Sequence, residues 1–312
     1  MQKHDSKLIM NHQARADLYK KIRDFFFKKG VLEVETPLLC QHTVTDPHIE
    51  SFKVPVTLSK DYFLQTSPEY AMKRLLATGS GCIYQITKSF RIGEAGHQHN
   101  PEFSMLEWYR IGFTHHDLMH ELDELLQYCL ETKPAEKVSY QQLFLTYLNI
   151  DPHNSDLTQL KQVISANNIQ MNLTTLDHDT ALQILLSHLI EPKLGIEKPL
   201  FLYDFPPSQA ALSKINNGVA ERFELYINGS EIANGFHELT DPAEQKTRFE
   251  KNQCDRKTRG QFIPNIDYYL IDALEKGLPD CSGVAIGLDR LLMQIIKTKA
   301  IQDVICFPFS IA

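Results

Sequence analysis

Two glutamates in the stretch RFELYINGSEIANG are candidates for metal binding. Asn228–Gly229 is the strongest short signal for a β-hairpin with a two-residue loop. That loop pairs Tyr226 with Glu231 and Glu224 with Ala233, which places the two carboxylates on one face with Cβ atoms about 7 Å apart. Carboxylates at that separation repel unless one takes a proton or a divalent cation lies between them. Two solvated carboxylates on an open sheet face are the alternative.

A third glutamate lies in the middle of HNPEFSMLEWYR, residues 99–110. Strand geometry directs Phe103, Met105, Glu107 and Tyr109 to one face and the residues between them to the other. If that face is covered, an ionised Glu107 loses several kcal/mol of hydration unless a cation or strong donors meet it. An internal arginine can supply that cation, and so can a ligand.

The number of such residues favours a ligand. Glutamates occur on or beside the predicted strand ends of one sheet at Glu69, Glu107, Glu224, Glu231 and Glu238, and aromatic residues accompany them at Phe103, Tyr109 and Phe236. Such a set suits a ligand that carries ammonium groups, together with a magnesium nucleotide.

Two arginines are candidate partners for the phosphates of a nucleotide. Arg91 ends the predicted strand QITKSFR, and Arg290 follows GVAIG. Gly287 permits close backbone approach, and a helix that begins near Leu288 offers free N–H groups to a phosphate. A surface position without a ligand is the alternative for each arginine.

The overall composition is that of an ordinary globular protein. Of the 312 residues 43% are hydrophobic and 23% are charged, which argues against a disordered or fibrous chain. The formal net charge is −7, and Lys and Arg are dispersed, whereas nucleic-acid binders usually have a broad basic surface. Extensive RNA binding is therefore not expected, although a local basic patch remains open.

Cysteine and histidine usage indicates neither disulfides nor zinc. The six cysteines have no CxxC spacing, as expected for reduced cytosolic thiols. The pairs His97/His99 and His115/His116 have no companion cysteine or acidic ligand at zinc-site spacing, so no zinc site is expected. Because the first residues form no apolar signal region and no apolar run approaches membrane-spanning length, we expect a cytoplasmic protein without membrane contact.

Several elements must position these residues. Apolar spacing predicts a long amphipathic helix over 11–29, capped by Gly30. VLEVETP is typical of a strand that Pro37 ends. In YFLQTSPEYAMKRLLATG a strand precedes a helix that Ser67 caps and that has Glu69 in its first turn. GCIYQITKSFR and HNPEFSMLEWYR are predicted to form an antiparallel hairpin with a long loop.

The second half of the chain returns to the sheet after a helical segment. Residues 115–197 are predicted to form a mainly helical insertion, and strand signals resume in PLFLYDFP and RFELYINGSEIANGF. Repeats and flexible linkers are not evident. We therefore predict a single α+β domain over residues 1–312, with the insertion beside its sheet.

The order of these stretches resembles the class II aminoacyl-tRNA synthetases. A helix leading to a strand that ends in Pro37 resembles motif 1, SFR with the loop to HNPEFSMLEWY resembles motif 2, and GLDR opening a C-terminal helix resembles motif 3. HNPEF, EIANGF.EL and DVICFP look like lysyl-tRNA synthetase in particular. A free-standing catalytic core without an anticodon-binding domain is similar to the family of elongation factor P–(R)-β-lysine ligases.

The resemblance implies a six-stranded antiparallel sheet flanked by helices and a homodimer formed through motif 1. It implies a ligase that uses ATP and Mg²⁺ to activate (R)-β-lysine as the acyl-adenylate. The acyl group then passes to a lysine ε-amino group of elongation factor P, and no tRNA anticodon is bound. A truncated synthetase acting on tRNA and a non-catalytic amino-acid-sensing paralogue are the alternatives. Such a paralogue typically loses motif arginines or metal carboxylates, and these are present here.

Carried over position by position, the resemblance also implies a role for each candidate residue. Arg91 and Arg290 are the implied catalytic residues, at the α- and γ-phosphates, and Glu224 and Glu231 are the implied metal ligands. The implied ATP site further includes Gly93, Glu94, His99, Asn100, Phe103, Glu231 and Gly287. The implied substrate site consists of Ser67, Glu69, Glu107, Tyr109, Asn234, Phe236, Glu238 and Ala285.

Three positions depart from the family pattern. Motif 2 usually reads Arg, any residue, Glu, whereas RIGE has Gly93 third and Glu94 next. Motif 3 of the synthetases resembles GxGxGxDR, whereas GVAIGLDR contains Ala285, and one extra methyl group changes substrate discrimination by about 1–3 kcal/mol. Together with Ser67, where the synthetases resemble Ala, this change fits a β-amino acid, whose amine lies one carbon farther from the carboxylate.

Overall fold

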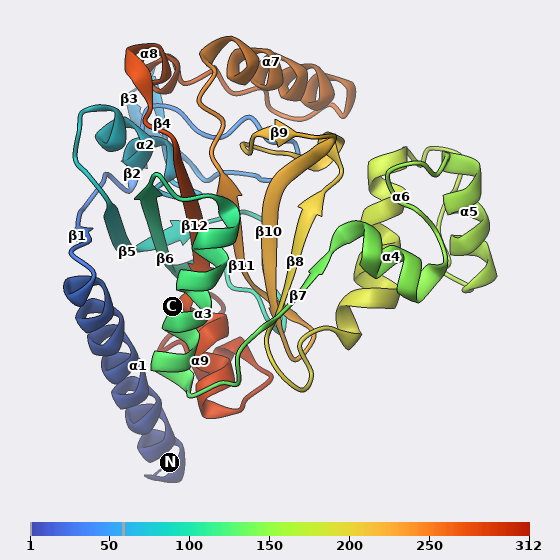
Figure 1. Cartoon of the computed structure of the whole chain (residues 1–312). Helices are drawn as coiled ribbons and strands as arrows, with labels where there is room; N and C mark the ends of the chain where they lie inside the picture. Colours follow the sequence, from blue (N-terminus) through green and yellow to red (C-terminus); the bar gives the residue numbers. More distant parts are fainter. Residues whose placement is uncertain (1, 58–59) are drawn as a thin grey trace. The chain divides into compact units, whose positions relative to one another are not determined.

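The structure is a computed structural model that describes residues 2–57 and 60–312. The chain divides into two compact units. Figure 1 labels their helices and strands. Unit 1 comprises Met1–Phe113 and Leu239–Ala312, and unit 2 comprises Thr114–Glu238. In the part of the chain that the structure describes, no helix is long and apolar enough to cross a membrane. The single domain over 1–312 stays a prediction, and each unit is described by itself below.

Unit 1 is organised around three antiparallel strands. The strand order is β1-β5-β6-β12, and β5 pairs with β6 exactly along the hairpin that the sequence predicts, with Gln85 opposite Glu107. The short β1 pairs with β5 in parallel. The strands of this sheet are β1 (Leu32–Glu33), β5 (Ile83–Phe90), β6 (Glu102–Ile111) and β12 (Cys281–Gly287). A second, smaller sheet has the order β2-β4-β3, formed by β2 (Leu39–Cys40), β3 (Lys53–Thr57) and β4 (Lys60–Leu64).

The strand predicted over VLEVETP is wrong beyond its first residues. Val34 still donates its N–H to the Tyr84 carbonyl at 2.9 Å, but the Thr36 hydroxyl bonds to the Gln85 side chain instead of continuing the ladder. The segment therefore leaves the sheet before it reaches Pro37, which itself has no N–H to donate.

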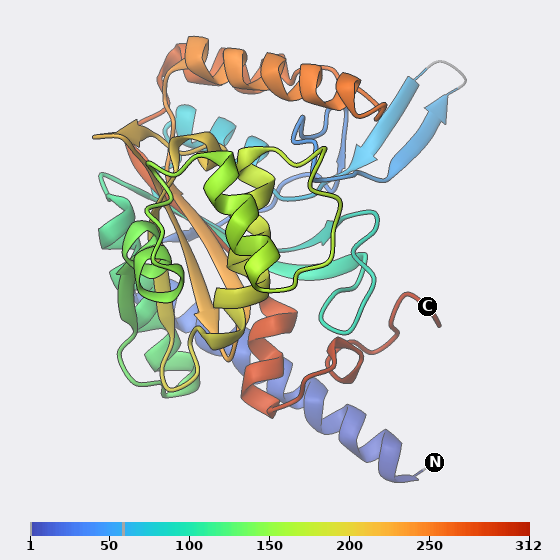
Figure 2. The same cartoon turned by 90° about the vertical axis from the view of Figure 1, so that its right-hand side faces the viewer.

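Unit 1 contains the predicted N-terminal helix, in a longer form than predicted, and four further α-helices among its described residues. Helix α1 (Gln2–Lys28) begins well before residue 11 and ends at Lys28, two residues before Gly30, whose φ is 66°. Ile22 and Phe26, on its inner side, are fully buried. Helix α2 (Glu69–Ala77) contacts α8 (Tyr268–Gly277), which also contacts α7 (Pro242–Thr258), and α9 (Leu288–Ile296) packs on β6 and α1. Figure 2 shows α7 along its length.

Unit 2 contributes another antiparallel set and the helical insertion. Its strand order is β11-β10-β8-β7, with β9 beside β10, and α3 packs on β10 and β11. The strands are β7 (Glu136–Ser139), β8 (Leu200–Phe205), β9 (Ile215–Asn216), β10 (Val219–Ile227) and β11 (Ser230–His237). The helices are α3 (His115–Leu130), α4 (Tyr140–Leu148), α5 (Leu157–Ala166) and α6 (His178–Leu185), followed by a short π-helix at Leu186–Ile190.

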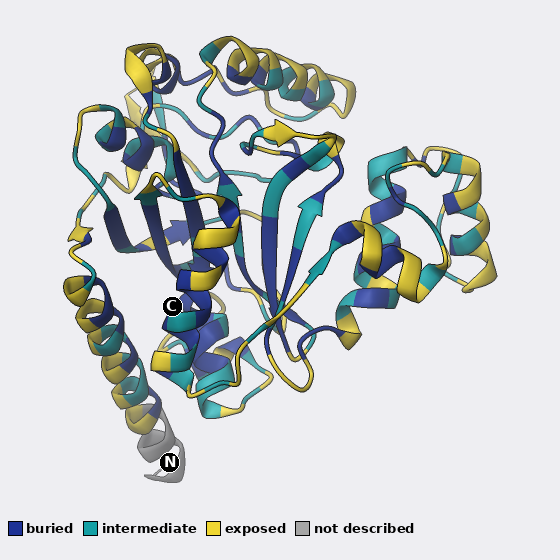
Figure 3. Ribbon diagram, viewed as in Figure 1, coloured by how far each residue is buried: buried dark blue, intermediate teal, exposed yellow. Residues whose placement is uncertain are grey.

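Both units confirm the predicted α+β class. The three long antiparallel strands β5, β6 and β12 of unit 1 and the three of unit 2, β8, β10 and β11, match in number the six that the resemblance implies. Short strands are added at β1, β7 and β9. Figure 3 shows these long strands mostly in the dark blue of buried residues. Residues 115–197 are mainly helical, as predicted, although they also contain β7.

Candidate active site

Glu107 lies at the centre of the sheet in unit 1, on the face that the sequence predicts. Its side chain is directly opposite Gln85 on one neighbouring strand and Ala285 on the other, and the residue is only 2% exposed. Hydroxyl groups meet both carboxylate oxygens, since Ser67 donates to Oε2 and Tyr109 donates to Oε1, each at 2.7 Å. The protein thus supplies neutral donors to this carboxylate.

The protonation of Glu107 is set by opposing effects. Burial and the charge of Glu69 raise the pKa of Glu107 to about 7, although the two hydroxyl donors and the ammonium of Lys73 work in the other direction. Near neutral pH, the carboxyl group is therefore close to half protonated when no further cation is present. A cationic ligand would favour the ionised form.

Lys73 is a buried member of this site that the sequence analysis missed. It is 1% exposed, and its Nζ contacts Glu69 Oε1 at 2.8 Å, four residues earlier on α2. Two carboxylates, Glu69 and Glu107, thus share one ammonium group in unit 1, which leaves one negative charge when both are ionised. The available signal was the position of Lys73 between Met72 and Leu76, the two other buried residues of α2.

Ser67 connects the start of α2 to the carboxylate. Its Oγ accepts the Glu69 N–H at 3.1 Å and donates to Glu107. The N-cap of α2 is Pro68 and not Ser67 as predicted, because the helix begins at Glu69. Gly79, at the other end of the helix, has a φ of 86° and lies just beyond the last turn. The position of Glu69 in the first turn is confirmed.

Arg91 lies directly after the end of β5 and contacts the loop that follows it. The Arg91 guanidinium lies 5.2 Å from the centre of the Phe103 ring, and its Nη1 is 3.4 Å from Glu94 Oε1. Gly93 has a φ of 85°, a left-handed conformation that favours glycine. The family pattern has a glutamate at the position of Gly93. In this chain the next residue, Glu94, contacts Arg91 instead.

Arg290 approaches the same loop from the first turn of α9. It donates from Nη2 to His99 Nε2, and its Nε is 3.4 Å from the Gln98 carbonyl. Burial and the charge of Arg290 lower the pKa of His99, so His99 accepts this hydrogen bond as a neutral ring. Gly287 immediately precedes α9 and lies opposite Met105. The side chains of Met105 and Glu107 point to the same face of the sheet, and Gly287 adds no side chain to that face.

Asp289, beside Arg290, holds several elements of unit 1 together. It is 2% exposed, accepts the Ser104 N–H at 2.6 Å, and forms an ion pair with Arg15 of α1. Arg15 also donates to the Val304 carbonyl at 2.7 Å. Sequence analysis missed both residues, because a charged residue on a polar helix gives no sign of a partner 274 positions away.

Asn100 is engaged on both sides of its amide. Its Nδ2 donates to the Glu102 carbonyl at 2.6 Å, and its Oδ1 accepts the Phe309 N–H at 3.0 Å. The residue is 7% exposed. The structure therefore places Asn100 as a link between the start of β6 and the C-terminal segment, and its implied role in adenine recognition stays a prediction.

The hairpin in unit 2 differs from the prediction by one residue. The pairing of Tyr226 with Glu231 is confirmed, but the pairing of Glu224 with Ala233 is wrong, because Glu224 lies opposite Asn234. A β-bulge between Leu225 and Tyr226 shifts the register. The extra residue on β11 is not visible in an alternating sequence pattern, whereas the turn itself is.

Glu224 has an arginine as its direct ionic partner, whereas Glu107 shares the ammonium of Lys73 with Glu69. Arg222 forms an ion pair with its Oε1, and the Tyr226 hydroxyl donates to its Oε2 at 2.6 Å. Burial and the surrounding carboxylates Glu224, Glu231 and Glu191 raise the pKa of Tyr226 well above its ordinary value. Three carboxylates therefore surround this phenol, and the sequence analysis missed Arg222, Tyr226 and Glu191 as their partners.

The donor set of this hairpin fits Mg²⁺, which prefers carboxylate oxygens. Each oxygen of Glu224 accepts one hydrogen bond and keeps a further lone pair, and Glu231 is partly exposed. Phe236 lies opposite Arg222, with the guanidinium 5.9 Å from its ring centre, and Glu238 is 1% exposed and pairs with Ser213. Arg222 also contacts Asn234, since its Nε donates to Oδ1 at 3.2 Å.

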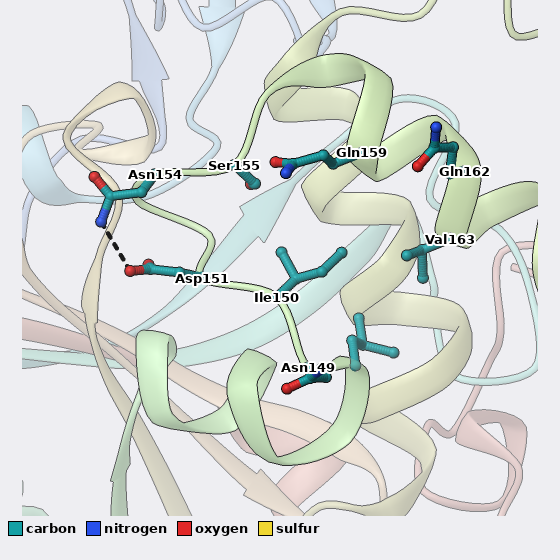
Figure 4. Close-up of a pocket in the computed structure, with 9 residues that line it drawn as sticks. Asn149, Ile150, Asp151, Asn154, Ser155, Gln159, Gln162 and Val163 are labelled. Atoms are coloured by element: carbon teal, nitrogen blue, oxygen red, sulfur yellow. Dashed lines mark hydrogen bonds between the residues drawn. The ribbon is translucent and has the colours of Figure 1, made fainter.

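A pocket of about 450 Å³ lies elsewhere in unit 2, between the loop after α4 and α5 (Figure 4). Amide side chains such as Gln159 and Gln162 line it, and Asn154 donates to Asp151 at 2.8 Å within it. No sequence-predicted site residue is among the described residues that line this pocket. We therefore assign it no part in the candidate site.

Comparison with known proteins agrees with this arrangement. Residues 1–310 match the family of tRNA synthetases class II (D, K and N). Relatives named elongation factor P–(R)-β-lysine ligase include those of Vibrio vulnificus (strain YJ016), 50% identical over 96% of this chain and 95% of the relative, and Vibrio cholerae serotype O1, 51% identical over 96% of each. The relative from Salmonella gallinarum is 49% identical over 97% of this chain and 96% of its own. The chain therefore belongs to the class II tRNA synthetase family and, within it, to the family of elongation factor P–(R)-β-lysine ligases.

Proposed function

We propose that this chain activates (R)-β-lysine with ATP and transfers the β-lysyl group to a lysine ε-amino group of elongation factor P. The names of the relatives, at about 50% identity over nearly the whole chain, support the substrate and the acceptor. The class II synthetase family supports the use of ATP, and the carboxylates of β10 and β11 are the proposed Mg²⁺ ligands.

The observation that carries the proposal is the charge of the Glu69, Lys73 and Glu107 cluster. The buried Glu107 and the partly exposed Glu69 share one ammonium, so one negative charge is left uncompensated when both are ionised, and the pKa of Glu107 is raised to about 7. An ammonium group of a lysine-like substrate compensates that charge. Tyr109 holds the Glu107 carboxylate from the side, and Ala285, directly opposite Glu107, limits the space beside it.

The other candidate residues take the roles that the chemistry of adenylation requires. The carboxylate of the amino acid attacks the α-phosphorus in line and pyrophosphate leaves, so guanidinium groups at the α- and γ-phosphates stabilise the developing charge. We assign these positions to Arg91 and Arg290, with Phe103 as the surface on which adenine stacks. Mg²⁺, held by Glu224 and Glu231, supplies further neutralisation of phosphate charge when bound.

The second step needs no protein nucleophile. The amine of the acceptor lysine attacks the carbonyl carbon of the acyl-adenylate, an amide bond forms, and AMP leaves with the electrons of the broken acyl–phosphate bond. The amine loses a proton during this attack. A homodimer through α1 and β1 and the absence of anticodon binding remain part of the proposal.

Intact-mass analysis of elongation factor P tests this function. The factor is incubated with the protein, ATP, Mg²⁺ and either (R)-β-lysine or α-lysine, with a factor that lacks the acceptor lysine as control. We expect a gain of one lysyl unit that is faster with the β isomer. ATP–pyrophosphate exchange without a mass gain would reject the acceptor and direct attention to tRNA, and silence in both assays would favour the sensing paralogue.

A further inference from the structure

A second cluster of potential ligands lies within unit 2, on the opposite face of the β10–β11 ladder from Glu224. Glu221 and His237 directly neighbour Arg222 and Phe236 in sequence, so their side chains point to the other face of the strands. His115, at the first position of α3, approaches them from the helix that packs on this ladder. One ligand atom from each of His115, Glu221 and His237 lies within 4.8 Å of the others.

His115 has the hydrogen-bonding pattern of a metal ligand. The residue is only 4% exposed, and its Nε2 lies 3.2 Å from Asp204 Oδ1. Its Nδ1 is buried and has no hydrogen-bond partner among the residues that the structure describes. When Nε2–H donates to Asp204, Nδ1 bears a lone pair without a donor. A carboxylate that orients a histidine through one nitrogen while the other binds metal is a recurrent arrangement at zinc sites.

The other two members offer the matching donors. His237 Nδ1 contacts Glu221 Oε2, and its Nε2 lies 3.2 Å from Lys214 Nζ. Since Lys214 donates to Nε2, Nδ1 is the nitrogen on the carboxylate side, and a metal ion can replace the proton between Nδ1 and Glu221. The charges of Glu221, Asp204 and Lys214 leave one negative charge in the cluster, which favours a divalent cation.

We propose that His115, Glu221 and His237 bind one divalent first-row transition metal ion, with Zn²⁺ as the probe, and that Asp204 orients His115. Two imidazoles and one carboxylate are a donor set that zinc accepts, with water as the fourth ligand. The sequence analysis expected no zinc site, because the acidic partners lie far from His115 in the chain. The proposal is independent of the ligase function, because Glu221 and His237 lie on the opposite face from Glu224 and none of these residues is assigned a role in adenylation or transfer.

Zinc titration by isothermal calorimetry tests the site. The full chain carries Cys306→Ser throughout, because Cys306 Sγ lies 2.8 Å from His12 Nε2 and offers a competing zinc site. We expect one Zn²⁺ per chain at low micromolar Kd or tighter, and at least tenfold weaker binding in His115→Gln and in His237→Gln. His120→Gln is the matched control, since His120 lies on the same helix with 72% of its side chain exposed and should change nothing.

Two further variants distinguish loss of the zinc site from loss of folding and from an overlapping set of ligands. Lys214→Met should strengthen Zn²⁺ binding several-fold, because it removes a positive charge next to His237, a result that a simple loss of folding does not give. His116→Gln separates this site from an overlapping set of His115, His116 and Asp204. The proposal is overturned if the chain binds no zinc, if His237→Gln binds as tightly as its parent, or if His116→Gln alone abolishes binding.

Discussion

Two buried glutamates at strand centres, Glu107 in unit 1 and Glu224 in unit 2, are stabilised in opposite ways. Glu224 has an ion pair with Arg222 and a hydrogen bond from Tyr226. Glu107 receives two hydroxyl donors and shares the ammonium of Lys73 with Glu69, which that ammonium contacts at 2.8 Å. The carboxylate of Glu224 is therefore neutralised within the protein, whereas that of Glu107 is stabilised only in part.

The difference indicates which carboxylate is suited to which ligand. A buried carboxylate with an incomplete set of cations binds an ammonium group with a gain in charge neutralisation, as at Glu107. At Glu224 a monovalent cation would compete with Arg222 for the same oxygens. A divalent ion that shares several oxygens is the better match there. If the proposed function is correct, local electrostatics suit Glu107 to the substrate ammonium and Glu224 to the metal ion of the nucleotide.

The largest expected contrast is in stability. Arg222→Met leaves Glu224 buried without its cation and should lower the free energy of unfolding by about 3 kcal/mol at pH 8. Glu107→Gln should change it by less than about 1 kcal/mol, because loss of a buried, poorly compensated charge offsets the altered hydrogen bonds. Urea unfolding of both variants measures the difference. Similar losses in the two would show that both carboxylates depend equally on internal partners.

The next effect concerns substrate affinity. Glu107→Gln should weaken binding of the lysine-like substrate about 100-fold, equivalent to about 2.7 kcal/mol, while the KM for ATP changes less than twofold. Glu102→Gln is the matched control, since Glu102 lies on the same strand with half of its side chain exposed. Substrate-dependent ATP–pyrophosphate exchange gives both constants. Equal weakening of ATP and substrate would contradict the assignment of Glu107 to the ammonium.

A smaller effect follows from the pKa of Glu107. Because this pKa is raised to about 7, the free protein holds a proton at lower pH that an ammonium ligand must displace. Substrate affinity should fall about tenfold between pH 8 and pH 6, with proton release on binding near pH 7. Calorimetry in two buffers of different ionisation enthalpy measures that release. A flat pH profile for the parent, or the same slope in Glu107→Gln, would assign the proton to another group.

The raised pKa of Glu107 affects stability in the opposite direction: substrate affinity rises with pH, whereas the stability of the free protein falls. A carboxyl group whose pKa is higher in the folded than in the unfolded state contributes its full stabilisation below the unfolded pKa. That contribution is lost as the pH rises through the folded pKa. In the absence of substrate, Glu107 should therefore weaken the fold progressively between about pH 4.5 and pH 7. Substrate, which favours the ionised form, should restore stability most strongly above pH 7.

The sequence predicted these sites to the extent that local pattern determines them. The face of Glu107 and the turn at Asn228–Gly229 follow from strand alternation and turn preference, and the structure confirms both. Ser67 accepts the N–H of Glu69, but the N-cap of α2 is Pro68, one residue after the predicted cap. The register of Glu224 could not be predicted, because the β-bulge that moves it leaves no mark on an alternating pattern.

Residues that complete the charge of each site also escaped prediction. Arg222 was close in sequence to Glu224, yet an alternating strand allows an ion pair, a ligand or solvent at such a position. Lys73 lies on another element from Glu107, and only the packing of α2 shows that its ammonium is buried. Sequence pattern thus identifies on which face a carboxylate lies, whereas the groups that neutralise its charge are set by tertiary contacts.

The smallest expected effect concerns the choice between lysine isomers. Ala285 lies directly opposite Glu107, which places the two Cβ atoms about 5 Å apart, so its methyl group borders the space beside the carboxylate. Ala285→Gly should raise the use of α-lysine relative to (R)-β-lysine about fivefold, within the range for one methyl group. Competition between the isomers, read by the mass of the acyl-adenylate, measures this ratio. An unchanged ratio would show that Ala285 does not select between the isomers. Ser67, which also departs from the family pattern and donates to Glu107, would then be the next residue to test.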